Sequence, residues 1–254
     1  MSALLEVAGL GKRFGGLVAV DGVAFTVQRD QVFAVIGPNG AGKTTVFNCI
    51  SGFYTPTSGR VVLDGEAVHG LPSHQVARRG LVRTFQNVRL FRNMTVVENL
   101  LVSQHTRLET MIWSGLFTTP AYRRAEREAM ERAAYWLDKV GLRPYANREA
   151  GNLAYGQQRR LEIARCMITG PRLLLLDEPA AGLNPQETRD LDLLIMDLRK
   201  SHGVSVLLIE HDMGLVMGIS DRILVMEYGR PIALGTPAEI RTDPRVIKAY
   251  LGEE

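Results

Sequence analysis

One nine-residue stretch combines three glycines with a lysine and two hydroxyl side chains. Glycines let the backbone wrap around phosphate groups, while successive N–H groups and a following helix N-terminus supply positive potential. The lysine adds a charge, the first hydroxyl is placed to hold Mg²⁺, and the second is placed to contact the phosphates. An apolar run precedes the stretch and a helical pattern follows it, as in a P-loop rather than a simple glycine turn. We therefore predict an ATP and Mg²⁺ site at Gly37, Pro38, Asn39, Gly40, Ala41, Gly42, Lys43, Thr44 and Thr45.

Two adjacent carboxylates end a run of four leucines at residues 173–176. Asp177 is expected to orient the Mg²⁺ through water, and Glu178 is expected to align or deprotonate the attacking water. Taken alone, two acids at a strand end are as consistent with a solvated turn. Together with the phosphate loop, they indicate hydrolysis of the bound nucleotide.

Composition limits what else the chain does. The 254 residues are 46% apolar and 22% charged, which is ordinary for a globular protein. The apolar runs fall far short of the roughly 20 residues that cross a bilayer, and the N-terminus lacks the pattern of an export signal, so a cytoplasmic location is expected. A net charge of +3 is too small to indicate nucleic-acid binding. Cys49 and Cys166 form no metal or redox pattern and are expected to be buried.

The elements that position these residues follow from short apolar runs at 32–36, 173–176, 204–209 and 223–226, which alternate with helical patterns. This alternation predicts a largely parallel sheet with helices on both faces. The clearest helix covers 185–200, with Asn184 as its cap and Glu187 completing a capping box. Strand patterns at 4–7, 24–27 and 60–63 predict an added antiparallel layer.

The β pattern disappears between Asn87 and Asn152, which predicts a helical lobe. A capping box at Thr95 opens its first helix. A second helix is expected from Pro120 to Gly141, with one stripe of buried side chains at Met130, Ala133, Leu137 and Val140. Residues 103–120 are expected to be a loop or short helices that contact a partner. The predicted fold is therefore an α/β P-loop NTPase core at 1–86 and 160–254, with an N-terminal antiparallel β layer and an inserted helical lobe at 87–159.

The remaining spacings resemble the nucleotide-binding subunits of ABC transporters over nearly the whole chain. The resemblance implies that Gln86 contacts Mg²⁺ or water and links the core to the lobe, and that His211 contacts the γ-phosphate and positions the water. It also implies that Phe14 stacks on adenine. Without the resemblance, a strand-end histidine is more often structural, and Phe14 could equally be a core residue.

The family's signature segment, usually Leu-Ser-Gly-Gly-Gln, is represented here by Leu153, Ala154, Tyr155, Gly156 and Gln157. In the family this segment binds the ATP held by the opposite subunit. Ala154 lacks the hydroxyl that would bind the γ-phosphate, and Asn184 stands where the family usually has Asp. The resemblance therefore implies a dimer of two related but different ATPases with unequal ATP sites.

The form of the signature segment, the long insert and the C-terminal residues 235–252 resemble one subgroup, the ATPases of branched-chain amino-acid importers. That resemblance implies two membrane-spanning permease subunits, a periplasmic or extracellular substrate-binding protein, and a peripheral location on the cytoplasmic face of the cell membrane. An ABC ATPase for lipid or lipopolysaccharide export is an alternative. A soluble ABC ATPase acting on DNA or ribosomes is a further one, although the tandem cassettes and basic extensions typical of that class are missing from the sequence.

Overall fold

The computed structural model describes residues 3–104 and 120–251. The chain divides into two compact units, one made of Met1–Gln86 with Arg172–Glu254 and the other of Asn87–Pro171. The expected lobe ended at residue 159, whereas the second unit extends to Pro171. The reason is that helix α7 (Tyr155–Met167) packs against α3 (Val96–Ser103) and α6 (Pro120–Lys139) of the same unit and is not divided between the two.

A six-stranded sheet carries the functional residues of the first unit. Its strands lie in the order β10-β9-β3-β8-β7-β6, and every neighbouring pair is parallel except β9 with β10. The prediction of a largely parallel sheet is thus confirmed. The strands are β3 (Val32–Ile36), β6 (Leu81–Arg83), β7 (Leu173–Asp177), β8 (Ser205–Ile209), β9 (Arg222–Glu227) and β10 (Arg230–Gly235).

The predicted N-terminal antiparallel layer is also present, as a four-stranded sheet in the order β2-β1-β4-β5. Its two long strands are interrupted by several register shifts, so the sequence pattern identified only their most regular parts. The strands are β1 (Ala3–Phe14), β2 (Leu17–Gln28), β4 (Ser58–Leu63) and β5 (Glu66–Ala67).

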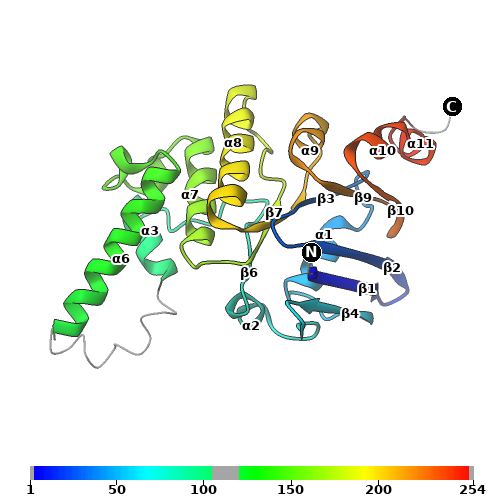
Figure 1. Ribbon diagram of the computed structural model, residues 1–254, viewed down its shortest axis with the longest axis horizontal. Coiled ribbons are helices and arrows are strands. Elements are labelled where there is room, and N and C mark those ends of the chain that lie inside the picture. Colours follow the sequence, from blue (N-terminus) through cyan, green and yellow to red (C-terminus); the bar gives the residue numbers. More distant parts are fainter. Residues whose placement is uncertain (1–2, 105–119, 252–254) are drawn as a thin grey trace. The chain divides into compact units, whose positions relative to one another are not determined.

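The core of the first unit lies between the two sheets, around helix α1 (Lys43–Ile50). Alternate side chains of the parallel strands, such as Leu173 and Leu175 of β7, belong to this core. Their neighbours Leu174 and Leu176 are equally buried, and helices α8 (Pro185–His202) and α9 (Met213–Ile219) cover that other face (Figure 1). Burial on both faces explains why these strands are continuous apolar runs without alternation.

Helix α8 begins and ends as its sequence predicts. The Asn184 side chain accepts the N–H groups of Gln186 and Glu187, and the Glu187 carboxylate accepts the N–H of Asn184 in return. Gly203 follows the helix at φ +60°, a backbone conformation that glycine adopts without strain. The shorter helices of this unit are α2 (Ser73–Arg78), α10 (Pro237–Thr242) and α11 (Pro244–Leu251).

The second unit is helical, as predicted, and Thr95 forms the expected capping box with Glu98. Two short 3₁₀ turns, Arg143–Tyr145 and Ala150–Asn152, connect α6 to α7. Ala133 and Leu137 of α6 and Val140 directly after it are buried, as predicted. The prediction that Met130 is buried is wrong, because Met130 is 45% exposed, and Ala129 and Trp136 complete the buried stripe. Most of the segment expected to contact a partner, residues 105–119, lies outside the described residues.

Both cysteines are buried, as expected, and burial raises the pKa of the Cys49 thiol to about 11 and that of Cys166 to about 12. In the described ranges, 3–104 and 120–251, no helix is long and apolar enough to cross a membrane.

Candidate nucleotide-binding site

The strand order brings the predicted site residues of the first unit, except Phe14, to one edge of the parallel sheet. Strand β3 lies beside β8, β8 beside β7, and β7 beside β6. Parallel neighbours end at the same edge, where α/β proteins bind their ligands. At that edge, β3 continues into Gly37, β7 into Glu178, β8 into Glu210 and His211, and β6 into the segment that ends at Gln86.

The phosphate loop connects β3 to α1, and its backbone requires glycine at two positions. A Cβ atom on Gly37 would lie 2.1 Å from the Met226 carbonyl oxygen, and Gly37 has φ +149°. Gly42 has φ +92°, and its Cβ would lie 2.5 Å from the Ala19 carbonyl oxygen. The N–H of Gly229, in the turn between β9 and β10, donates to the Ala41 carbonyl at 3.1 Å and holds the loop from outside.

Lys43, at the start of α1, is buried against this loop. Its Nζ donates to the carbonyl oxygens of Gly37 at 2.7 Å and Pro38 at 2.9 Å. Burial lowers the pKa of the Lys43 ammonium, and the nearby carboxylates of Glu178 and Asp177 act in the opposite direction. The charge is therefore held inside the loop by backbone oxygens and acidic neighbours, where a nucleotide phosphate would meet it.

A cleft of about 410 Å³ opens over the loop. It brings Lys43 and the two threonines together with Glu178 and His211, although these come from three separate parts of the sequence. Sequence reasoning missed other lining residues, which have no polar signature. They are Leu17, Val18 and Ala19 of β2 together with Tyr228 and Gly229.

Phe14 is placed near this region but does not line the cleft. Its ring meets the ring of Tyr54 edge-on at 5.3 Å, and the Lys12 ammonium lies 5.0 Å from its centroid. Phe14 is 43% exposed, so it is not a core residue. Stacking of Phe14 on adenine stays a prediction.

Three side chains predicted to act in hydrolysis meet at Glu178. Gln86 Nε2 donates to Glu178 Oε2 at 2.8 Å, and His211 Nε2 lies 3.0 Å from Glu178 Oε1. Glu178 itself has φ +46°, a left-handed conformation that is strained for a residue with a side chain. Such backbone strain is typical of functional residues, because stability alone would favour glycine at a left-handed position.

The residues predicted to hold Mg²⁺ offer a hydroxyl from Thr44, a carboxylate from Asp177 and an amide oxygen from Gln86. These are hard oxygen donors, which Mg²⁺ prefers. No cluster of three or more His, Cys, Asp or Glu side chains occurs in the described part of the chain. The donor set therefore fits an ion that takes part of its coordination from substrate phosphates and water. Asp177 is buried, and Arg83 donates to its Oδ2 at 2.6 Å.

Glu210 is a buried residue that the sequence reading did not single out. Its carboxylate accepts the backbone N–H of Ala180 at 2.6 Å and that of His211 at 2.9 Å. Burial raises the pKa of Glu210, while these N–H groups lower it. Because Ala180 follows Glu178 closely in sequence, the carboxylate ties the backbone beyond Glu178 to the backbone of His211. Its position directly after the apolar run of β8 was the available signal.

Asp192 of α8 lies in the same acidic neighbourhood. Burial, together with the charges of Asp212 and Glu210, raises the pKa of Asp192 to about 6. Within the described residues, its Oδ1 is buried without a hydrogen-bond partner. The carboxylate therefore reduces the stability of the folded state when it is ionised.

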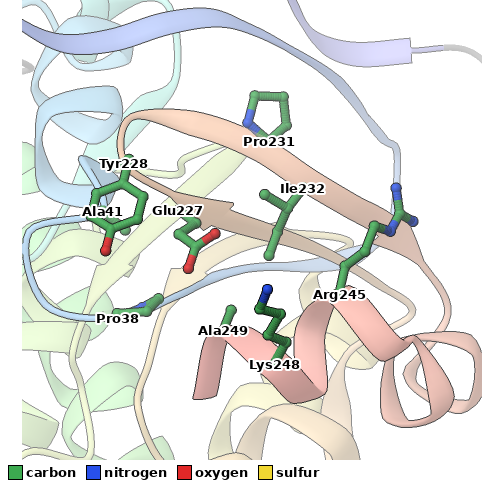
Figure 2. A pocket seen from close by; sticks show the side chains of 9 residues that line it. All are labelled: Pro38, Ala41, Glu227, Tyr228, Pro231, Ile232, Arg245, Lys248 and Ala249. Atoms are coloured by element: carbon green, nitrogen blue, oxygen red, sulfur yellow. The ribbon is translucent and has the colours of Figure 1, made fainter. Parts of the chain in front are cut away.

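A larger hollow, of about 770 Å³, adjoins the phosphate loop at Pro38 and Ala41 (Figure 2). Tyr228 lies on the same side of the hollow as these two residues, and α11 contributes Arg245 and Lys248 to the opposite side (Figure 2). None of the predicted hydrolytic residues lines this hollow. The smaller cleft is therefore the candidate nucleotide site.

The signature segment belongs to the second unit. Ala154 stands at the cap position of α7, where its methyl group cannot accept the N–H that a serine hydroxyl would. The Gln157 side chain accepts the N–H of Ala154 at 3.1 Å. Tyr155 is 43% exposed, whereas Leu153 and Gly156 are buried. The first N–H groups of an α-helix have no carbonyl acceptor within the helix, so the N-terminus of α7 can bind an anion.

Comparison with known proteins assigns the family. Residues 20–181 match the ABC transporter family, and residues 230–254 match a family described as branched-chain amino acid ATP-binding cassette transporter. The chain is 67% identical over 250 residues to the high-affinity branched-chain amino acid transport ATP-binding protein BraF of Pseudomonas aeruginosa, covering 98% of each chain. It is 62% identical over 250 residues, again covering 98% of each, to LivG of Escherichia coli, which carries the same description.

A solved structure shows the same fold. The chain superimposes on the ADP conformation of an ATP-binding cassette of an ABC transporter with a TM-score of 0.86 and 32% identity, over 100% of both chains. The sequence matches, the solved structure and the phosphate-loop cleft agree, and this chain therefore belongs to the ABC transporter family, in the group of the branched-chain amino acid transport ATP-binding proteins.

Proposed function

We propose that this chain hydrolyses Mg-ATP to drive the import of branched-chain amino acids through separate membrane subunits. The observation that carries the hydrolytic part is the convergence of Gln86 and His211 on Glu178. Glu178 and His211 line the cleft that also contains Lys43. The cargo is supported by the names of the two bacterial relatives and by the match of residues 230–254.

In the proposed reaction, Glu178 accepts a proton from water as the water oxygen bonds to the γ-phosphorus and the bond to the β–γ bridging oxygen breaks, which leaves ADP and phosphate. Gln86 and His211 hold the two Glu178 oxygens in place. Lys43 and the loop N–H groups stabilise the phosphate charge. Thr44, Asp177 and Gln86 would hold Mg²⁺, which when bound neutralises charge on the phosphates.

The functional assembly is proposed to contain a second, related ATPase, two permease subunits on the membrane and a substrate-binding protein on the far side. The chain would then lie on the cytoplasmic face of the membrane. Ala154 supports unequal ATP sites, because losing one hydrogen bond to a charged phosphate costs roughly 1.5–3 kcal/mol, or about tenfold or more in affinity. That loss affects the site whose phosphate loop belongs to the partner, while the Lys43 site would be completed by the partner's signature segment.

The test is to purify the native complex, identify its ATPase chains and reconstitute it in lipid vesicles. ATP-dependent uptake of labelled leucine is expected in the wild type and is expected to be lost with Lys43→Ala. Uptake of another cargo without leucine, isoleucine or valine would contradict the proposed substrate. A complex with two copies of this chain and full transport would contradict the heterodimer, and equal losses from Lys43→Ala and from the partner's matching lysine change would contradict unequal sites.

A further inference from the structure

A buried arginine at the end of β6 connects two elements that carry proposed magnesium ligands. Arg83 Nη2 donates to Asp177 Oδ2 at 2.6 Å, and only 5% and 4% of the two side chains are exposed. Arg83 Nη1 donates to Asn48 Oδ1 at 2.7 Å and to Ser51 Oγ at 3.1 Å. Asn48 lies in α1, the helix that begins with Lys43 and Thr44, and Ser51 is its C-terminal cap. One guanidinium therefore joins α1 to the end of β7.

Aromatic rings enclose the same guanidinium. Its Cζ lies 5.5 Å from the ring centroid of Phe47, 5.8 Å from that of Phe53 and 5.7 Å from that of Phe85. Rings at this distance stabilise a cation, and they hold the planar group in one orientation. Lysine could not replace it, because an ammonium on a flexible stem does not present two donors in a fixed fork.

We propose that Arg83 is a positioning residue for the magnesium site. Arg83 donates hydrogen bonds both to Asp177 Oδ2 and to acceptors at α1, and it thereby sets the separation between the Asp177 carboxylate and the Thr44 hydroxyl. Asp177 Oδ1 accepts no hydrogen bond from the residues that the structure describes, so it is the oxygen left for a water bound to the ion. Arg83 also lies three positions before Gln86, so the third proposed ligand continues from the same strand. This inference rests on the proposed role of Asp177.

The competing explanation is that Arg83 is only a buried ion pair required for folding. Loss of one partner from such a pair is strongly destabilising wherever it occurs. The second unit supplies a matched control, because Arg159 Nη1 donates to Glu162 at 2.8 Å with 0% and 5% of the two side chains exposed. Arg159 contacts none of the proposed magnesium ligands through this pair. A purely structural role predicts that Arg83→Lys and Arg159→Lys have the same consequences.

The experiment measures the affinity for Mn²⁺, used as a paramagnetic substitute for Mg²⁺, on the full-length chain saturated with ATP, and separately the affinity for ATP in EDTA. Residues that orient metal ligands typically contribute about 10- to 100-fold to metal affinity. Arg83→Lys is therefore expected to weaken Mn²⁺ binding about tenfold or more while ATP binding in EDTA is unchanged. Arg159→Lys is expected to lower the melting temperature with wild-type Mn²⁺ affinity.

Asn48→Ala removes the closer of the two acceptors that α1 and its cap offer to Arg83, without touching the carboxylate, and it decides the question if the Arg83 variants do not fold. A several-fold loss of Mn²⁺ affinity is expected. Wild-type Mn²⁺ affinity in folded Arg83→Lys, or in Asn48→Ala if the arginine variants do not fold, would overturn the inference. Unchanged Mn²⁺ affinity in Asp177→Asn would instead remove Asp177 from the magnesium site, and the proposed metal ligands would fail together with this inference.

Discussion

Replacing Glu178 by glutamine separates its proposed chemical role from its structural one. Gln86 offers a donor to Glu178 Oε2, so the new amide should turn its oxygen toward Gln86 and its NH₂ toward His211 Nε2, which accepts a hydrogen bond when the ring proton is on Nδ1. Both hydrogen bonds then survive, and the backbone at residue 178 is unchanged. Only the ability to accept the water proton is lost. Because a nearby negative charge is also removed from Lys43, ATP affinity is expected to be kept or increased.

The magnitude follows from the role. A general base contributes about 10²- to 10⁴-fold to the rate, which corresponds to about 2.7–5.4 kcal/mol in the activation free energy. The assays are phosphate release by the assembled complex at saturating Mg-ATP, and the dissociation constant for ATP. Glu66→Gln, which alters a surface carboxylate paired with Arg79, serves as the control and should leave turnover unchanged. Turnover of Glu178→Gln within about threefold of the wild type would refute the assignment of Glu178 as base.

Three further outcomes are expected. His211→Ala should suppress hydrolysis with little change in melting temperature, because the side chain is 41% exposed; a large loss of melting temperature with normal turnover would favour a structural role. Asn184→Ala should lower the free energy of unfolding by about 1 kcal/mol, since two N–H groups lose their acceptor, and urea titration measures this. The pKa of Asp192 is raised from 3.8 to about 6, so its ionisation removes stability as pH rises through that interval. Asp192→Asn should therefore raise the melting temperature at pH 8 and leave it unchanged at pH 4. After allowance for the partial exposure of Asp192, the gain at pH 8 is about 1 kcal/mol in the free energy of unfolding, or about 2–4 °C. The control Asp190→Asn, at an exposed position, should not change the melting temperature at either pH.

Much of the local structure could be predicted from the sequence, because its causes lie within a few residues. The phosphate loop needs a strand, glycines with unusual backbone angles and a helix start, and all of these are consecutive from β3 to α1. Helix α8 carries its own cap at Asn184 and its own stop at Gly203. The buried stripe of α6 was harder to predict, because adjacent faces of a helix differ by a single residue, and Met130 was placed on the wrong side.

The composite site depended on tertiary structure. Gln86, Glu178 and His211 meet only because β6, β7 and β8 are neighbours in that order, and strand order is decided by long-range packing that no local pattern records. Family resemblance implied the proposed roles of Gln86 and His211 without supplying this geometry.

Arg83 shows the difference most clearly. In the sequence it is one of 30 lysines and arginines, and 94 positions separate it from Asp177. The sequence by itself determined the phosphate loop and identified Asp177 as the acid proposed to bind the metal, because residue types and short spacings define both. Only the tertiary structure determined that Arg83 pairs with Asp177, because a buried charge needs an opposite charge close in space, and that partner can lie anywhere along the chain.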